Sequence, residues 1–204
     1  MAERDRLAPC TADRQSPPER HAPEWLTSGL RSLEGAPSLD QAVLALHRVS
    51  EVVVRSPELE GMLRGDRFGH ALHPLLTDFP LGAYLSATLL DLFGGRASRP
   101  AATALIGFGL AMTMPTAAAG VAEWRASGQG SRRVGVVHAA VNVTATSLYA
   151  ASMLARLRRR HRRGVMLALA GGSAAWIGGY LGGHLSLVRK IGTADPAFGP
   201  AASS

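Results

Sequence analysis

Residues 100–122, with the sequence PAATALIGFGLAMTMPTAAAGVA, contain no Asp, Glu, Lys or Arg. Residues 134–155 and 164–188 are two further runs without any of these four residue types. An α-helix needs about 20 consecutive apolar residues to cross the hydrocarbon core of a bilayer. Each of the three runs is therefore long enough to span a membrane.

A fourth segment, residues 74–93, has a similar length but contains Asp78 and Asp91 near its two ends. A carboxylate costs less there than at the centre of a bilayer. Pro80 and Pro115 lie inside their segments, where Thr hydroxyls nearby should bind the carbonyls that each proline leaves free. We therefore predict an all-α fold, a four-transmembrane-helix bundle. The predicted spans are residues 74–93, 100–122, 134–156 and 165–188.

Charge divides the chain into a polar head and an apolar body. The 204 residues carry a net charge of +7, yet residues 1–72 contain eleven acids and nine arginines, and the rest of the chain contains only four acids. Cys10 is the only cysteine, which excludes an internal disulfide and a cysteine-ligated cluster. The predicted organisation is a disordered tail (1–37), an amphipathic helix and linker (38–72), a transmembrane domain (73–190) and a flexible C-terminal tail (191–204).

Arginines in the short loops predict the orientation of the chain in the membrane. Six arginines lie in the loop of residues 156–163, RLRRRHRR, and two more lie in the loop between the first two spans. Because positive loops stay in the cytoplasm, we predict a multi-pass cell-membrane protein with loop 156–163 inside and both termini outside. A basic turn between two spans favours this role over a nucleic-acid site, so the expected partner is the lipid bilayer.

Antiparallel threading should bring one set of polar residues to the same end of the bundle, at the outer face of the membrane. Each of two spans carries a polar stripe on one helical face: on the third span His138, Asn142, Ala145, Tyr149 and Ser152, and on the fourth span Ser173, Ile177, Tyr180 and His184. Polar faces of membrane helices should point into the bundle, because lipid offers no hydrogen-bond partner. The candidate cofactor or metal ligands are His70, His73, His138 and His184, with Asp78, Glu123, Asn142 and Tyr180 supporting them.

Convergent imidazoles are compatible with three kinds of chemistry. Two histidines on facing helices, drawn from His73, His138 and His184, suit the axial positions of a b-type haem. Two or three histidines with a carboxylate suit a transition-metal ion. Histidine and acid near the interface also suit a proton relay or a quinone site. The structural alternative is that these residues only join the helix ends to one another.

Several motifs in the body resemble those of one bacterial family. Residues 69–82, GHALHPLLTDFPLG, followed by LLDLF at 89–93, resemble the opening of the DUF2231 predicted membrane proteins. PTAAAGVAEW (115–124), RVGVVH (133–138) and GGYLGGHL (178–185) are similar to its later blocks. The resemblance implies four transmembrane helices and gives no activity. Some relatives look fused to a Rieske-type iron–sulfur domain, which implies a link to electron transfer.

These observations lead to two main hypotheses. The first is a redox-associated integral membrane protein, not an enzyme by itself, that binds haem or a metal ion and meets a soluble redox partner. The alternative is a non-catalytic membrane scaffold or anchor for a partner protein, able to form homo-oligomers. A transporter is less well supported, because we detect no internal repeat and no charged residue at mid-membrane. The sequence contains no CxxCH, GxSxG, HExxH or P-loop motif to favour other chemistry.

Overall fold

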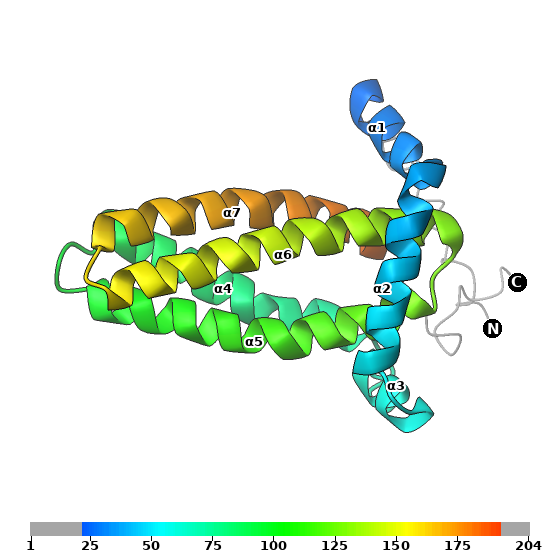
Figure 1. Ribbon diagram of the computed structural model, residues 1–204, viewed down its shortest axis with the longest axis horizontal. Coiled ribbons are helices and arrows are strands. Elements are labelled where there is room, and N and C mark those ends of the chain that lie inside the picture. The colour runs from blue at the N-terminus through cyan, green and yellow to red at the C-terminus, as the bar shows by residue number, and fades with distance from the viewer. Residues whose placement is uncertain (1–21, 193–204) are drawn as a thin grey trace, which may run out of the picture.

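The computed structural model describes residues 22–192, and each regular element in this range is a helix. Four long antiparallel helices form the body of the molecule, as the sequence predicts (Figure 1). They are α4 (Leu72–Phe93), α5 (Arg99–Arg125), α6 (Gln129–Leu157) and α7 (His161–Gly183), the last continued by a π-helical turn, η2 (His184–Val188). Three helices, α5, α6 and α7 with η2, are long and apolar enough to cross a membrane. By the same measure of length and composition, α4 is not.

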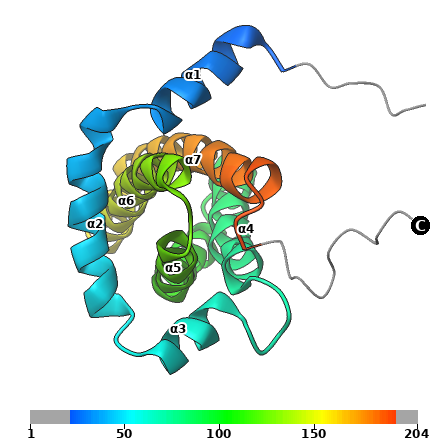
Figure 2. The same ribbon diagram turned by 90° about the vertical axis from the view of Figure 1, so that its right-hand side faces the viewer.

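Three shorter helices curve around one end of the four-helix body (Figure 2). They are α1 (Glu24–Glu34), α2 (Asp40–Val53), which follows the 3-10 turn η1 (Pro37–Leu39), and α3 (Pro57–Arg64). We call residues 24–64 the collar. The end of the body that it surrounds is the histidine mouth, and the opposite end, at the α6–α7 turn, is the arginine mouth.

The collar corrects one prediction and confirms another. Residues 1–37 are predicted to be disordered, but Glu24–Glu34 is helical, because Leu26, Leu30 and Leu33 form a half-buried face of that helix. Residues 1–21 and 193–204 of the two predicted tails lie outside the described residues. The predicted amphipathic helix is α2, although no side chain caps its N-terminus.

A threonine of α5 compensates the proline inside α4. Pro80 has no N–H, so it leaves the carbonyl of Leu76, one turn earlier, without its helical partner. The hydroxyl of Thr116 donates to that carbonyl at 3.1 Å. The predicted rescue of a proline by a threonine is therefore present, and it also ties α4 to α5.

The four long helices form two similar hairpins, which the sequence-based prediction of no internal repeat missed. Helices α4 and α6 carry matching residues 65 positions apart: His73 and His138, Tyr84 and Tyr149, Ala87 and Ser152, Asp91 and Arg156. Helices α5 and α7 carry matching residues 62 positions apart: Ala102 and Gly164, Ile106 and Ala168, Gly109 and Gly171, Gly120 and Gly182. Both hairpins start at the histidine mouth, so the repeat is parallel, with its axis along the bundle.

The centre of the body is built from this repeat. The rings of Tyr84 and Tyr149 stack with centroids 3.7 Å apart and an interplanar angle of 6°. Glycines let each ring approach the second helix of its own hairpin: a Cβ on Gly109 would stand 2.5 Å from Tyr84, and one on Gly171 would stand 3.2 Å from Tyr149. Ile106 and Ala168 complete the buried cluster around the rings.

Candidate functional site

The structure brings together two of the three histidines that the sequence predicts to converge. The ring centroids of His73 and His138 are 6.3 Å apart, and the rings meet edge to face at 85°. Each ring fits against a glycine of the second helix in its hairpin. A Cβ on Gly120 would stand 2.8 Å from the His73 ring, and one on Gly182 would stand 2.9 Å from the His138 ring.

Each of these imidazoles is bonded to a backbone carbonyl of its own hairpin. The Nδ1 of His73 lies 2.9 Å from the oxygen of Thr116, and the Nδ1 of His138 lies 2.9 Å from the oxygen of Gly178. Because a carbonyl only accepts, both Nδ1 atoms carry the proton and donate. The amide nitrogen of Asn142 lies against the ring of His138, 3.1 Å from Nε2 and 3.3 Å from Nδ1, and it donates to the backbone oxygen of His138 at 3.0 Å.

His184 is not part of this pair. Its Nε2 lies 2.9 Å from Oε1 of Glu34, a residue of the collar. The guanidinium of Arg189 donates to both oxygens of the same carboxylate, with Nε 2.6 Å from Oε1. Arg189 thereby holds the pKa of Glu34 below its ordinary value of 4.5. Glu34 from one part of the chain and His184 and Arg189 from another thus fasten α1 to the end of α7.

The other predicted supporting residues take different positions. Glu123 is buried, but it accepts from the backbone N–H of His73 at 3.3 Å and not from an imidazole. Among residues 22–192, the ring of His70 bonds only the adjacent carbonyl of Ala71. Asp78 is exposed, and Tyr180 is 43% exposed. Within residues 22–192 neither side chain makes a hydrogen bond or an ion pair.

One of the two predicted polar stripes faces the interior, and the other does not. On α6, Ala145, Tyr149 and Ser152 are buried, as predicted. On α7, the predicted stripe of Ser173, Ile177 and Tyr180 is exposed. The buried face of α7 consists instead of small residues and one leucine, because only small residues leave room for the side chains of α6. They are Gly164, Ala168, Gly171, Gly178 and Leu181.

The geometry at the histidine mouth is not that of a three-ligand metal site. Among the described residues, no group of three or more His, Cys, Asp or Glu side chains could hold one ion. His73 and His138 provide two nitrogen donors, and the candidate third ligand is bound to the collar. The contacts of these side chains can join the helices to one another. The imidazoles of His73 and His138 also provide the two nitrogen ligands that a bis-imidazole site needs.

Ion pairs from the collar reach both hairpins around the histidine mouth. Arg133 of α6 makes a two-pronged contact with Asp40, with Nε–Oδ1 at 2.7 Å and Nη2–Oδ2 at 2.9 Å. The same guanidinium donates to the backbone oxygen of Glu34 at 3.0 Å. On the first hairpin, Nε of Arg125 lies 3.9 Å from Oε1 of Glu60. The collar is thus fastened at three positions along its length.

A buried ion pair at the arginine mouth was missed by sequence reasoning, which counted Arg156 as a loop charge. Arg156 lies in α6, and its guanidinium donates to both carboxylate oxygens of Asp91, one of them at 2.9 Å. The side chains are 0% and 3% exposed. Arg156 also donates to Ser152 at 3.2 Å, and Ser152 donates to the oxygen of Gly164 at 2.6 Å. The spacing of Asp91 from His73 equals that of Arg156 from His138, and this could have revealed the pair.

The fold and both mouths therefore define a helical membrane protein whose polar groups are concentrated at the two ends of its spans. The chain belongs to the family described as predicted membrane protein DUF2231, whose model matches residues 69–195. The match begins after the collar and includes all four long helices. No curated protein and no solved structure matches this chain.

Proposed function

We propose that this protein is a non-catalytic membrane scaffold, in which four spanning helices hold the collar at the membrane surface as an anchor for a partner protein. The observation that carries the proposal is the set of ion pairs between the collar and the bundle: Glu34 with Arg189, Asp40 with Arg133, and Glu60 with Arg125. In addition, Nδ1 of His73 and Nδ1 of His138 are both bonded to backbone carbonyls within the chain. Such contacts hold a structure in place.

Two exposed flanks of α2 support a position in the headgroup layer. Ala45, Val49 and Val52 follow the i, i+4, i+7 spacing of one helical face, and the two valines are 53% and 63% exposed. His47 and Glu51 lie on the other flank, with side chains 43% and 60% exposed, together with Leu44, which is 59% exposed. A helix with one apolar flank and one mixed flank, crossing the ends of spanning helices, suits the boundary between lipid and water (Figure 1).

The proposal includes α4 as the fourth span and an orientation with the arginine mouth in the cytoplasm. Asp91, the acid at the end of α4, is neutralised by Arg156, which lowers the cost of placing α4 in lipid. Seven arginines at the arginine mouth have no hydrogen-bonding or ion-pair partner for their side chains within the described part of the chain. They are Arg96, Arg99, Arg158, Arg159, Arg160, Arg162 and Arg163. Unpaired positive charge of this kind favours the cytoplasmic side.

Fluorescent labels on the two flanks of α2 test the scaffold proposal. Val52→Cys and Glu51→Cys are made in a full-length chain with Cys10→Ser and are labelled in vesicles. We expect the label at position 52 to be quenched by a lipid that carries a nitroxide at the depth of the headgroups. The label at position 51, the matched control, should be quenched by iodide in the aqueous phase. If iodide quenches both labels equally, the collar does not lie at the membrane surface and the proposal fails.

The orientation is tested in intact cells with a membrane-impermeant maleimide. The Glu51→Cys variant should be labelled from outside, and an Arg158→Cys variant should be labelled only after lysis. The reverse pattern would place the arginine mouth outside and contradict the proposed topology.

A second candidate function rests on the imidazole pair, His73 and His138. Both rings donate from Nδ1 to backbone carbonyls, which is the usual arrangement of histidines that bind a metal through Nε2. A b-type haem held there would supply one-electron transfer. The donor set fits two axial ligands, and the amide of Asn142 lies beside the ring of His138, 3.1 Å from Nε2.

Absorption spectroscopy of the full-length protein, produced with haem precursor, tests the second candidate. A Soret band should be present, should vanish in His73→Ala and His138→Ala, and should persist in the control variants His70→Ala and His184→Ala. A correctly folded protein without a Soret band would exclude haem at this pair.

A further inference from the structure

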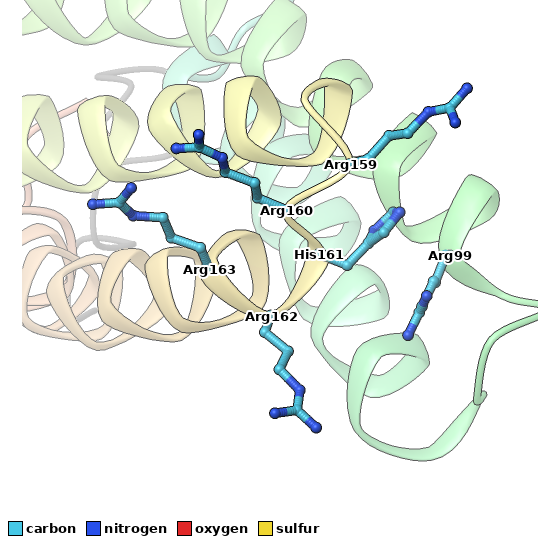
Figure 3. A pocket seen from close by; sticks show the side chains of 6 residues that line it. All are labelled: Arg99, Arg159, Arg160, His161, Arg162 and Arg163. Atoms are coloured by element: carbon cyan, nitrogen blue, oxygen red, sulfur yellow. The ribbon is translucent and has the colours of Figure 1, made fainter.

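The turn between α6 and α7 forms one side of a hollow of about 440 Å³ that is lined only by basic residues (Figure 3). Arg99 comes from the first turn of α5, and the other residues come from the α6–α7 turn and the first turn of α7. Arg159, in the turn, has a positive φ of 60°. The lining residues are Arg99, Arg159, Arg160, His161, Arg162 and Arg163.

Like charges in one hollow are costly unless an anion lies between them. Asp91 is the acid nearest this mouth, and Arg156 binds both of its oxygens. Within residues 22–192, the five arginine side chains of the hollow have no carboxylate partner. The chain therefore gathers positive charge here and does not neutralise it, unlike at the histidine mouth.

Backbone groups and one buried atom add donors to the same place. Helices α5 and α7 both begin here, and no side chain caps either N-terminus. The first N–H groups of α7 and the dipoles of both helices favour an anion, whereas the first turn of α5 contains Pro100, which has no N–H. The Nδ1 of His161 is buried and has no hydrogen-bond partner within the described residues. These donors, together with the arginines, suit the oxygens of a phosphate group.

A second hollow, of about 430 Å³, adjoins the first and has an apolar side. Arg99, His161 and Arg162 line both hollows, so the two lie side by side, and Asp91, which is bound to Arg156, also lines the second. The second hollow adds Val165 and Met166 of α7, and Met166 is 72% exposed. A ligand that fills both would need a phosphate at one end and hydrocarbon at the other.

We propose that the arginine mouth is a binding site for an anionic phospholipid, with the phosphate between Arg99, the α6–α7 turn and His161, and the acyl chains beside Val165 and Met166. The site lies where spanning helices end, which is the depth of lipid phosphates. Basic pockets between transmembrane helices bind anionic headgroups in this way. The site is separate from the collar and from the imidazole pair, so it does not depend on the proposed function.

Binding is measured on the full-length protein in detergent by native mass spectrometry, with added phosphatidylglycerol or zwitterionic phosphatidylcholine. We expect phosphatidylglycerol to bind more tightly. The triple variant Arg159→Gln, Arg160→Gln, Arg162→Gln should lose about 100-fold in affinity for it, since each of the three basic residues near a lipid surface contributes about 1 kcal/mol. The matched control changes Arg31, Arg48 and Arg67 to Gln, which removes equal charge from exposed positions outside the site.

Two further measurements make the outcome decisive. Circular dichroism of both triple variants checks that they remain helical. If the triple variant of the site does not fold, Arg162→Gln alone replaces it, and this single variant should lose less affinity in the same direction. Glycerol phosphate, the headgroup without acyl chains, should compete only weakly. Equal binding of the two lipids, or equal losses in both triple variants, would overturn the proposal. Strong competition by glycerol phosphate would assign the site to a soluble phosphate and also overturn it.

Discussion

At the histidine mouth, Arg125, Arg133 and Arg189 each meet a carboxylate from the collar. At the arginine mouth the carboxylate of Asp91 is bound by Arg156, and the arginines of the loop meet none within the described residues. Arg132 and Lys190 at the histidine mouth have no carboxylate partner among the described residues, so the bundle ends in a partly neutralised surface on one side and an unneutralised surface on the other. The polar head of the sequence supplies the counter-ions of only one mouth, because the collar surrounds only that end.

The two mouths also differ in how deeply their charges are buried. The Asp91–Arg156 pair is enclosed between the hairpins, whereas the side chain of Asp40 at the other mouth is 40% exposed. A buried pair becomes strongly unfavourable when one partner is removed, because an uncompensated charge remains in a medium of low dielectric constant. Exposed pairs contribute little to global stability. We therefore expect that removing one partner of an ion pair costs more stability at the arginine mouth than at the histidine mouth.

The largest effect is expected from Arg156→Ala. It leaves Asp91 buried without its partner, and we expect the free energy of unfolding to fall by about 3–5 kcal/mol. Thermal unfolding in detergent, followed by circular dichroism, measures the change. Arg158→Ala, an exposed control two residues later, should alter stability by less than about 0.5 kcal/mol. Similar unfolding curves for the two variants would show that the pair does not join the hairpins.

A smaller loss is expected from Gly109→Ala, between the two mouths. The new Cβ would stand 2.5 Å from the Tyr84 ring, and overpacking of this kind costs about 1–3 kcal/mol. Gly171→Ala, at the matching position of the second hairpin, should cost less because its Cβ would stand 3.2 Å from the Tyr149 ring. Gly179→Ala has open space around it and is the control. Equal unfolding midpoints for all three variants would contradict this order.

Arg133→Ala should release the collar without unfolding the bundle. The substitution removes both contacts with Asp40 and the bond to the backbone of Glu34. We expect limited proteolysis to cut residues 24–53 sooner, while the unfolding midpoint of the spans stays the same. Arg31→Ala, in exposed α1, serves as the control. A simultaneous loss of helical structure in the spans would mean that the collar is part of the bundle core.

The smallest effect is a pH dependence of the α1 contact. Because the pKa of Glu34 is lowered in the folded protein, its contribution is fully present above the ordinary value of 4.5 and is lost as the pH falls through the folded value. Amide hydrogen exchange of residues 24–34, corrected for the intrinsic rate, should rise below pH 4.5. Glu34→Gln should show the faster exchange already at neutral pH. Unchanged protection in acid would contradict the role of this carboxylate.

Some features of the fold follow directly from the sequence. The charge-free runs give the positions of α5, α6 and α7 because a long apolar helix without charges is defined by its own composition. The interior face of α6 was also predictable, since Tyr149 and Ser152 recur at helical spacing with His138. Helix α1 was missed because Leu26, Leu30 and Leu33 lie among charged residues and form a helix face only when the collar packs against the bundle.

The candidate site was only partly predictable for a different reason. His73 and His138 converge because the two hairpins run in the same direction and carry these residues at matching positions. His184 turns to Glu34 of the collar, which precedes it by 150 residues. The face of α7 that the sequence predicted to be buried is exposed. The buried face consists largely of glycine, which has no side chain to indicate burial in the sequence.

The sequence by itself determined that this protein is a bundle of long apolar helices with its charge at the ends, because helix length and desolvation are local properties. Only the tertiary structure decided which charges meet and which imidazoles pair. Those contacts depend on how far each helix is rotated about its axis, and the glycine contacts with rings from the neighbouring helix set that rotation. The unpaired cations at the arginine mouth likewise became visible only once Arg156 was found to be bound to Asp91.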